Sequence, residues 1–393
     1  VIISIAVIHM ARDFNWDLLL QGQVLGAFFY GYVLSQVAGA YLAQLYGGKI
    51  VLNCAVAGWS LLTVATPVLA KSSLTALIIG RILLGFSEGM AFPVIYHLFS
   101  GWVPKSESSR SIVSLNVGTC GGTVLAFVAS PWLVDYSGWE SVFYVFGWGG
   151  ILWCLAWHFM GADKHKPSPK QTLNVQLLAE LLRPSPLYAI YFCHFSWNVC
   201  LYICVMWLPT YLENQYNLNS KQTWINALPY LVMAPSAMGW GWVVDLWLAN
   251  SHQSSKRISS NTIRKVATAV GFMGGAVGLM LFCAASTPHV AILLLCGTFF
   301  ISSLSLCGWE AAKLNALDSS KAGMLQGVSN TISNFAGVIG VPLASYIKEM
   351  TDSWEAVWIM CATVWVAAAI VYILFAAGNN NEDKSGDYSI VNA

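Results

Sequence analysis

The feature that most constrains the fold is the recurrence of long apolar stretches from one end of the chain to the other. The hydrocarbon core of a bilayer is about 30 Å thick and takes about 20 apolar residues in a helix. A shorter apolar stretch, "VIISIAVIHM", opens the chain, and we expect it to be the second half of a truncated first helix. Eleven stretches have the full length, at about 19–42, 51–70, 73–97, 111–134, 141–161, 187–211, 223–247, 265–285, 289–312, 323–347 and 354–378. The sequence therefore predicts an all-α, polytopic membrane protein with twelve spans.

The composition agrees with a lipid bilayer as the surroundings. Charged residues make up 9% of the chain and hydrophobic residues 57%, whereas a soluble domain carries about 25% charged residues. Too few polar groups remain to cover a surface that faces water on all sides. The net charge is +1, and no basic cluster has interleaved aromatic residues, so no nucleic-acid partner is expected.

The longest polar interruption divides the predicted spans into six and six. It contains "DKHKPSPKQTLNVQ" and "RPSP", and polar, proline-rich segments of this kind are typical of linkers. We therefore expect residues 1–161 to form an N-terminal six-helix half and residues 187–378 a C-terminal half. Residues 162–186 are the predicted linker, and residues 379–393 a polar tail whose composition favours disorder.

Basic residues predict the orientation. If the spans alternate, 14 of the 19 lysines and arginines fall on the side of the linker, and one, Arg81, falls inside a span. The opposite side has four: Arg12, Lys71, Lys221 and Lys348. Because positive charge is retained on the cytoplasmic side, the linker is expected to face the cytoplasm or its topological equivalent.

Two opposite charges stand inside the span at 73–97, in "GRILLGFSEGMAFP". Arg81 and Glu88 are seven residues apart, which is about 10 Å along a helix and nearly the same face. An unpaired charge at the bilayer centre costs between about 2.5 and more than 10 kcal/mol, so both must face the protein interior or a water-filled cavity. One reading is a buried pair that fixes the helix position; the other, which intramembrane charges favour, is a transport site.

The chemistry of the two residues suggests different roles in such a site. The guanidinium of Arg81 stays charged and grips carboxylate or phosphate groups bidentately, so Arg81 is the predicted anion ligand. Glu88 is the predicted ion-coupling residue. An anion that neutralises Arg81 favours a proton on Glu88, which would couple anion and H⁺ movement.

Several motifs follow one another in the order of a known family. They are "FFYGYVLSQVAGAYLAQLYGGK", "GRILLGFSEGMAFP", "WVPKSESSRS", "WLPTYLE" and "LDSSKAGMLQGVSNTISNFAGVIG". In this order they resemble the anion:cation symporter branch of the major facilitator superfamily. That branch includes vesicular glutamate and nucleotide transporters, sialin and plant plastid phosphate transporters. The resemblance implies a twelve-helix transporter, with Arg81 and Glu88 at motif positions for anion binding and cation coupling.

A second resemblance concerns the loops. "GAYLAQLYGGK" (Gly39–Lys49) and "GWGWVVD" (Gly239–Asp245) are similar to the superfamily's signature loop, G-x-x-x-D-x-x-G-[RK]-[RK]. In the first copy the aspartate position is Gln44. The resemblance implies a gating role for Gly39, Gly47, Gly48, Lys49 and Asp245.

Other polar residues inside spans are candidate substrate ligands. His194 and Asn198 lie at i and i+4, on one helix face; hydrogen bonding within the bundle is the alternative for the histidine. Tyr30 and Tyr32 each offer a hydroxyl or pack as an aromatic ring. Asn334 either binds the substrate or joins helices.

Glu310 and Lys313, in "GWEAAKLNALD", depart from the family pattern. At i and i+3 they can contact each other. They form either a local ion pair near the cytoplasmic edge, or a part of the cavity. In the second case Lys313 is another cation for a polyanionic substrate and Glu310 another ion-coupling residue.

These observations predict a secondary active transporter of inorganic phosphate or a small organic anion, coupled to Na⁺ or H⁺, that works by alternating access. No metal site and no cofactor beyond the coupling ion is expected. The alternative is a transport-inactive or accessory membrane subunit. An enzyme is not expected, since the chain lacks a phosphate loop, HExxH and a nucleophile triad. Plastid, vesicular, lysosomal and plasma membranes remain open, as does the oligomeric state.

Overall fold

The computed structural model describes residues 1–103, 108–163, 181–182, 187–218, 220–253, 258–315 and 319–376, and within them every regular element is a helix. The predicted linker lies mostly outside the described residues, and the tail at 379–393 entirely so. The first helices are α1 (Ile2–Phe14), α2 (Leu18–Tyr46), α3 (Gly48–Ser72), α4 (Leu74–Gly89), α5 (Ala91–Trp102), α6 (Ser108–Ser137) and α7 (Glu140–Met160). They are followed by α9 (Leu187–Tyr216), η2 (Ser220–Ala227), α10 (Leu228–Gln253), α11 (Ser260–Cys283), α12 (Pro288–Ser302), η3 (Ser303–Cys307), α13 (Trp309–Asn315), α14 (Ser319–Thr351) and α15 (Trp354–Phe375).

The helices follow the predicted spans. In the described part of the chain, ten segments are long and apolar enough to cross a membrane, and they match ten of the eleven full-length stretches. The remaining stretch, 323–347, lies within α14, and the short first stretch forms α1. The all-α, twelve-helix prediction therefore agrees with the structure, because bilayer thickness fixes how long each apolar stretch must be.

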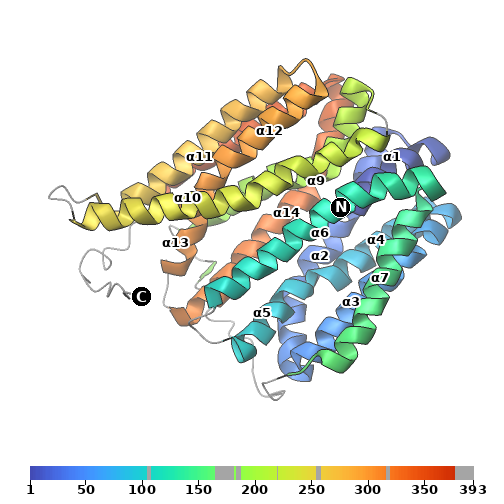
Figure 1. Cartoon of the computed structure of the whole chain (residues 1–393), viewed down its shortest axis with the longest axis horizontal. Coiled ribbons are helices and arrows are strands. Elements are labelled where there is room, and N and C mark those ends of the chain that lie inside the picture. Colours follow the sequence, from blue (N-terminus) through green and yellow to red (C-terminus); the bar gives the residue numbers. More distant parts are fainter. Residues whose placement is uncertain are drawn as a thin grey trace.

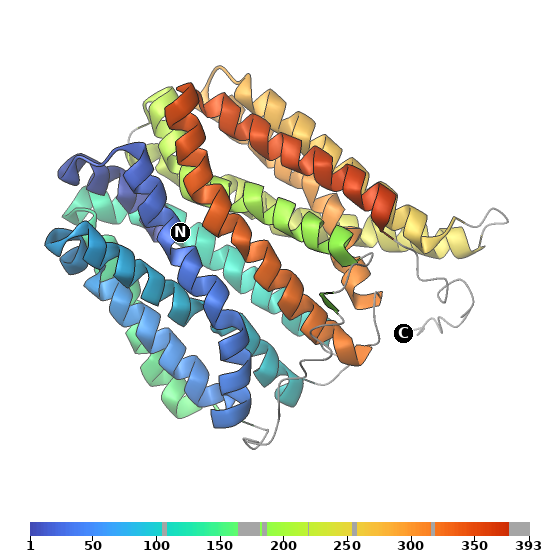
Figure 2. The ribbon, with the colours of Figure 1, turned by 180° about the vertical axis from the view of Figure 1, so that it is seen from behind.

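Two groups of helices are visible in both ribbon views (Figures 1 and 2). We call α1–α7 the N-terminal helix group and α9–α15 the C-terminal helix group. In Figure 1 the blue helices α2, α3 and α4 and the green helix α7 lie together, and the yellow and orange helices α10, α11 and α12 lie together. The two groups meet where α2 packs on α14, α1 on α9, and α6 on η2 and α10.

Glycines bring α2 and α4 into backbone contact. A Cβ at Gly31 would lie 2.6 Å from the backbone nitrogen of Phe86, and one at Gly85 would lie 2.8 Å from the carbonyl carbon of Phe28. Small residues allow this close approach of helices in membranes. Because α4 carries Arg81 and Glu88, the contact fixes how both residues face the bundle interior.

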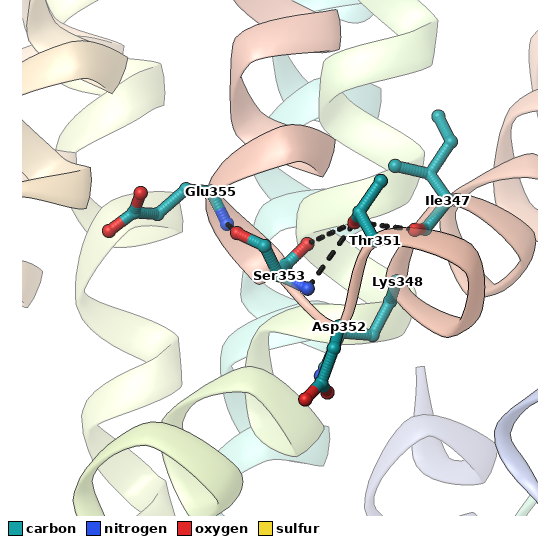
Figure 3. A network of polar contacts seen from close by, with 6 residues as sticks. All are labelled: Ile347, Lys348, Thr351, Asp352, Ser353 and Glu355. Carbon is teal, nitrogen blue, oxygen red and sulfur yellow. Dashed lines mark hydrogen bonds and ion pairs between the residues drawn. The ribbon is translucent and has the colours of Figure 1, made fainter.

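The turn between α14 and α15 lies opposite the linker side and is closed by short-range hydrogen bonds (Figure 3). Ser353 Oγ accepts from the backbone N–H of Glu355 at 3.1 Å, which caps the start of α15. Lys348 Nζ donates to Asp352 Oδ1 at 2.5 Å. This hydrogen bond to the ammonium lowers the pKa of Asp352, which lies outside the spans.

The signature-loop residues are mostly helical. Gly39 lies inside α2, and the turn that follows this helix is formed by Gly47 with φ of 90°. Gly48 and Lys49 begin α3, where the Lys49 backbone N–H donates to Asp163 Oδ1 at 2.9 Å. A carboxylate from beyond the end of α7 thus stabilises the positive end of the helix dipole.

The predicted position of Asp245 in a loop is wrong. Helix α10 continues to Gln253, and Asp245 is an exposed residue within it. Residues 246–253 contain neither glycine nor proline, so no helix-breaking residue ends α10 at the motif.

Candidate substrate cavity

A cavity of about 2030 Å³ lies between the two helix groups. Seven of the eight predicted substrate and ion-coupling residues line it: Arg81, Glu88, His194, Asn198, Glu310, Lys313 and Asn334. Residues far apart in the sequence are thus brought to one site by α4, α9, α13 and α14.

The eighth residue, Tyr30, does not line the cavity. Its side chain is 49% exposed on the outside of α2, whereas Tyr32 lines the cavity. Two residues along a helix correspond to a rotation of about 200°, so these tyrosines face nearly opposite directions. Of the two tyrosines, Tyr32 is therefore the candidate ligand and Tyr30 is not.

The cavity extends toward the linker side. Its lining includes Gln44 near the end of α2, Tyr96 on α5 and Gln326 near the start of α14. These positions lie at the helix ends that face the predicted linker.

At the opposite side the two groups are in close contact. A Cβ at Gly26 would lie 2.6 Å from Pro342 Cγ, and one at Gly22 would lie 2.8 Å from Ser345 Cβ. Nearby, Arg12 on α1 forms an ion pair with Glu213 on α9. The structure is therefore closed at this side and open toward the linker.

Arg81 is buried with unused hydrogen-bonding capacity. The residue is 5% exposed, and its guanidinium carbon lies 5.3 Å from the centroid of the Phe28 ring. Among the described residues, its Nε has no hydrogen-bond partner. A buried donor without a partner is costly, so an anion in the cavity would find a donor ready to bind it.

Lys313 belongs to a polar cluster on the C-terminal helix group. Its Nζ lies 2.6 Å from Glu310 Oε2, 3.0 Å from His194 Nδ1 and 4.8 Å from the centroid of the Trp309 ring. An ammonium only donates hydrogen bonds, so Nδ1 of His194 accepts, and we assign the imidazole proton to Nε2. His194 is therefore neutral, and its Nε2–H is the group that can donate a hydrogen bond. The predicted ion pair of Glu310 and Lys313 is present, and it lines the cavity.

A chain of hydrogen bonds links α9 to α14. Asn198 Nδ2 donates to Ser333 Oγ at 3.0 Å, and the Tyr202 hydroxyl donates to Asn334 Oδ1. Asn334 Nδ2 in turn donates to the carbonyl oxygen of Asn330 at 2.7 Å. Asn198 and Asn334 therefore join helices and line the cavity at once.

Gln36 and Tyr202 are among the cavity residues that the sequence analysis missed. Asn330 Nδ2 donates to Gln36 Oε1 at 2.6 Å, which connects the two helix groups. The signal for Tyr202 was its spacing, four residues after Asn198 on one helix face. Gln36 gave the same kind of signal as an amide within a predicted span.

A family model described as the Major Facilitator Superfamily matches residues 1–340. The ascorbate transporter, chloroplastic, of Arabidopsis thaliana is 31% identical over 95% of this chain and 71% of its own length. The sodium-dependent phosphate transport protein 1, chloroplastic, of the same plant is 30% identical over 95% of this chain and 75% of its own length.

The same architecture occurs in solved structures. The crystal structure of the D-xylose–proton symporter superposes with a TM-score of 0.71 and 13% identity, covering 95% of this chain and 93% of that one. At that identity the likeness concerns the fold alone. Fold, cavity and matches together define a multi-pass membrane transporter rather than an enzyme. The chain belongs to the major facilitator superfamily and, within it, to the anion:cation symporter family.

Proposed function

We propose that the chain is a secondary active transporter of inorganic phosphate or a small organic anion, coupled to Na⁺ or H⁺. One observation carries the proposal. Arg81, with an unpartnered Nε among the described residues, and Glu88 line the same cavity between the two helix groups. A buried guanidinium suits an anion, and a carboxylate two helical turns away suits the coupling cation.

The named relatives support an anionic substrate. One is named for ascorbate, an organic anion, and the other for sodium-dependent phosphate transport. They differ in the substrate that their names give, so the choice between phosphate and an organic anion depends on residues of this chain.

The proposed cycle uses the asymmetry between the two sides. In the linker-open state, an anion binds Arg81 and the coupling cation neutralises Glu88. Rocking of the N-terminal helix group against the C-terminal group then closes the linker side and separates the contacts at the opposite side. These contacts are the ones between Gly26 and Pro342 and between Arg12 and Glu213.

Uptake into proteoliposomes tests the proposal. Labelled phosphate, ascorbate, urate, sialic acid, nucleotide and glutamate are offered under imposed Na⁺ and H⁺ gradients. We expect Arg81→Gln to abolish uptake, and Glu88→Gln to abolish gradient-driven accumulation while anion exchange continues.

Glu349→Gln is the matched control, because Glu349 lies in a separate cavity on the side opposite the linker. We expect this variant to transport normally. Full accumulation by Glu88→Gln would contradict the coupling role. No flux of any anion under any gradient would leave the accessory-subunit alternative.

A further inference from the structure

The cavity has one buried cation on each helix group. Arg81 is on α4 and Lys313 is on α13, and they are 5% and 2% exposed. Among the described lining residues, no other lysine or arginine is present. A substrate that contacts both cations would therefore connect the N-terminal and the C-terminal helix groups.

The face of α9 that lines the cavity carries three residues on the path of contacts between the two cations. His194, Asn198 and Tyr202 follow at intervals of four residues, so the first and last are about 12 Å apart along the helix. Lys313 contacts His194 at the first end. At the other end the ring of Tyr202 lies 4.6 Å from that of Phe29.

Phe29 continues this line to Arg81. Its ring lies 5.2 Å from the ring of Phe28, against which the Arg81 guanidinium is placed. Among the described residues, the contacts of Arg81 and those of Lys313 have no residue in common, so a single phosphate or carboxylate group, with hydrogen bonds of about 2.8 Å on each side, is too small to bind both cations. The surface between them carries the rings of Tyr202, Phe29 and Phe28 beside the Asn198 amide, and it suits a mainly apolar body.

Lys313 already has an anionic partner that a substrate can replace. Glu310 Oε2 lies 2.6 Å from its Nζ, and the Glu310 side chain is 35% exposed while that of Lys313 is 3% exposed. The carboxylate is thus the more accessible member of the pair, and the ammonium is fixed by His194 and Trp309. An incoming acidic group would take the place of Glu310 at a cation that stays where it is.

From this geometry we propose that the substrate is an organic anion with two acidic groups separated by an apolar body. One acidic group binds Arg81, and the other displaces Glu310 from Lys313. The inference rests on the proposed function and narrows it, since inorganic phosphate has a single acidic centre and cannot bind both cations at once.

Binding of matched anions to the purified full chain tests the inference, with dissociation constants from intrinsic tryptophan fluorescence at pH 7.5. The anions are suberate, its monomethyl ester, succinate and inorganic phosphate. Suberate and its ester have the same length and differ in one charge, whereas succinate has both charges at a shorter separation. We expect suberate to bind at least about tenfold more tightly than the other three, as one additional charge-assisted hydrogen bond allows.

Variants separate a binding role of Lys313 from a structural one. Lys313→Gln is expected to remove the preference for suberate and to leave binding of the monomethyl ester unchanged. Glu310→Gln, which retains the lysine and removes its competitor, is expected to strengthen suberate binding several-fold. The control Lys348→Gln alters a lysine outside the cavity and should change neither.

Three results would overturn the inference: equal binding of suberate and its ester by the unmodified chain, an equal loss of both in Lys313→Gln, or no effect of Glu310→Gln on suberate. If the anions still bind and Arg81→Gln abolishes their binding, the proposed function stands without this refinement. If no anion binds and Arg81→Gln changes nothing, both fail.

Discussion

Replacing Gly85 by alanine adds one methyl group at the backbone contact between α2 and α4. The new Cβ would lie 2.8 Å from the carbonyl carbon of Phe28 and 3.1 Å from the backbone nitrogen of Tyr32. Carbon atoms in favourable contact are about 3.5–4.0 Å apart. The two helices must therefore separate by about 0.7 Å or more, because backbone atoms cannot turn aside as a flexible side chain can.

The matched control is Gly121→Ala in α6, where a Cβ would have no heavy atom within 4 Å. Alanine gains up to about 1 kcal/mol over glycine in a helix, and this gain is common to both variants. The overpacking cost of about 1–3 kcal/mol applies to Gly85→Ala alone. The difference in free energy of unfolding between the two variants should therefore be about 1–3 kcal/mol.

Thermal unfolding in detergent at one scan rate measures this difference. With about 2 °C per kcal/mol for a large domain, Gly85→Ala should have a Tm about 2–6 °C below that of Gly121→Ala. Its uptake rate should also fall, because Arg81 and Glu88 move with α4. Equal Tm values for the two variants would show that α2 and α4 do not touch through their backbones at this position.

Two further predictions concern contacts outside the cavity. Arg12→Ala and Glu213→Ala should each favour opening at the side away from the linker. A double-mutant cycle on the equilibrium between the linker-open and linker-closed states should give a coupling energy of about 0.2–1 kcal/mol, because the arginine side chain is 63% exposed. Exchanging the two charges, with Arg12→Glu and Glu213→Arg in one chain, should restore the distribution between the two states. An unrestored distribution would argue against a direct ion pair. Asp163→Ala removes the acceptor of the Lys49 backbone N–H and should lower the free energy of unfolding by about 0.5–1 kcal/mol in thermal denaturation; an unchanged Tm would refute this.

The sequence predicted the spans well because a bilayer imposes one length on every crossing segment. It also placed Arg81 and Glu88 in the interior, since neither charge is tolerated against lipid. Both residues line the cavity. The interruption of the tenth predicted span, where η3 and α13 follow α12, was not visible in hydropathy, because the segment Pro288–Lys313 as a whole stays apolar enough to cross a membrane despite the serines at the break.

The choice between Tyr30 and Tyr32 shows what the sequence could not supply. Both residues are equally suited as hydroxyl donors, and hydropathy does not define the rotation of α2 about its axis. Gly31 between them determines it, because its backbone contacts α4. That contact turns Tyr32 toward the cavity and Tyr30 toward the outside.

Contacts between residues on distant helices could not be predicted from the sequence either. Lys313 and His194 are 119 positions apart, and Asn330 and Gln36 are 294 positions apart. Within its own helix, none of these residues has a sequence pattern that indicates its partner. Only the packing of α13 and α14 against α9 and α2 brings them within hydrogen-bonding distance.

The size of the cavity determines how much water the protein exchanges with the bulk when the cavity opens and closes. A volume of about 2030 Å³ corresponds to on the order of 70 water molecules at about 30 Å³ each. A state of the cycle that is closed at both sides must return most of this water to the bulk. The population of such a state is therefore linked to water activity, so that a solute too large to enter the cavity favours it by osmotic force alone.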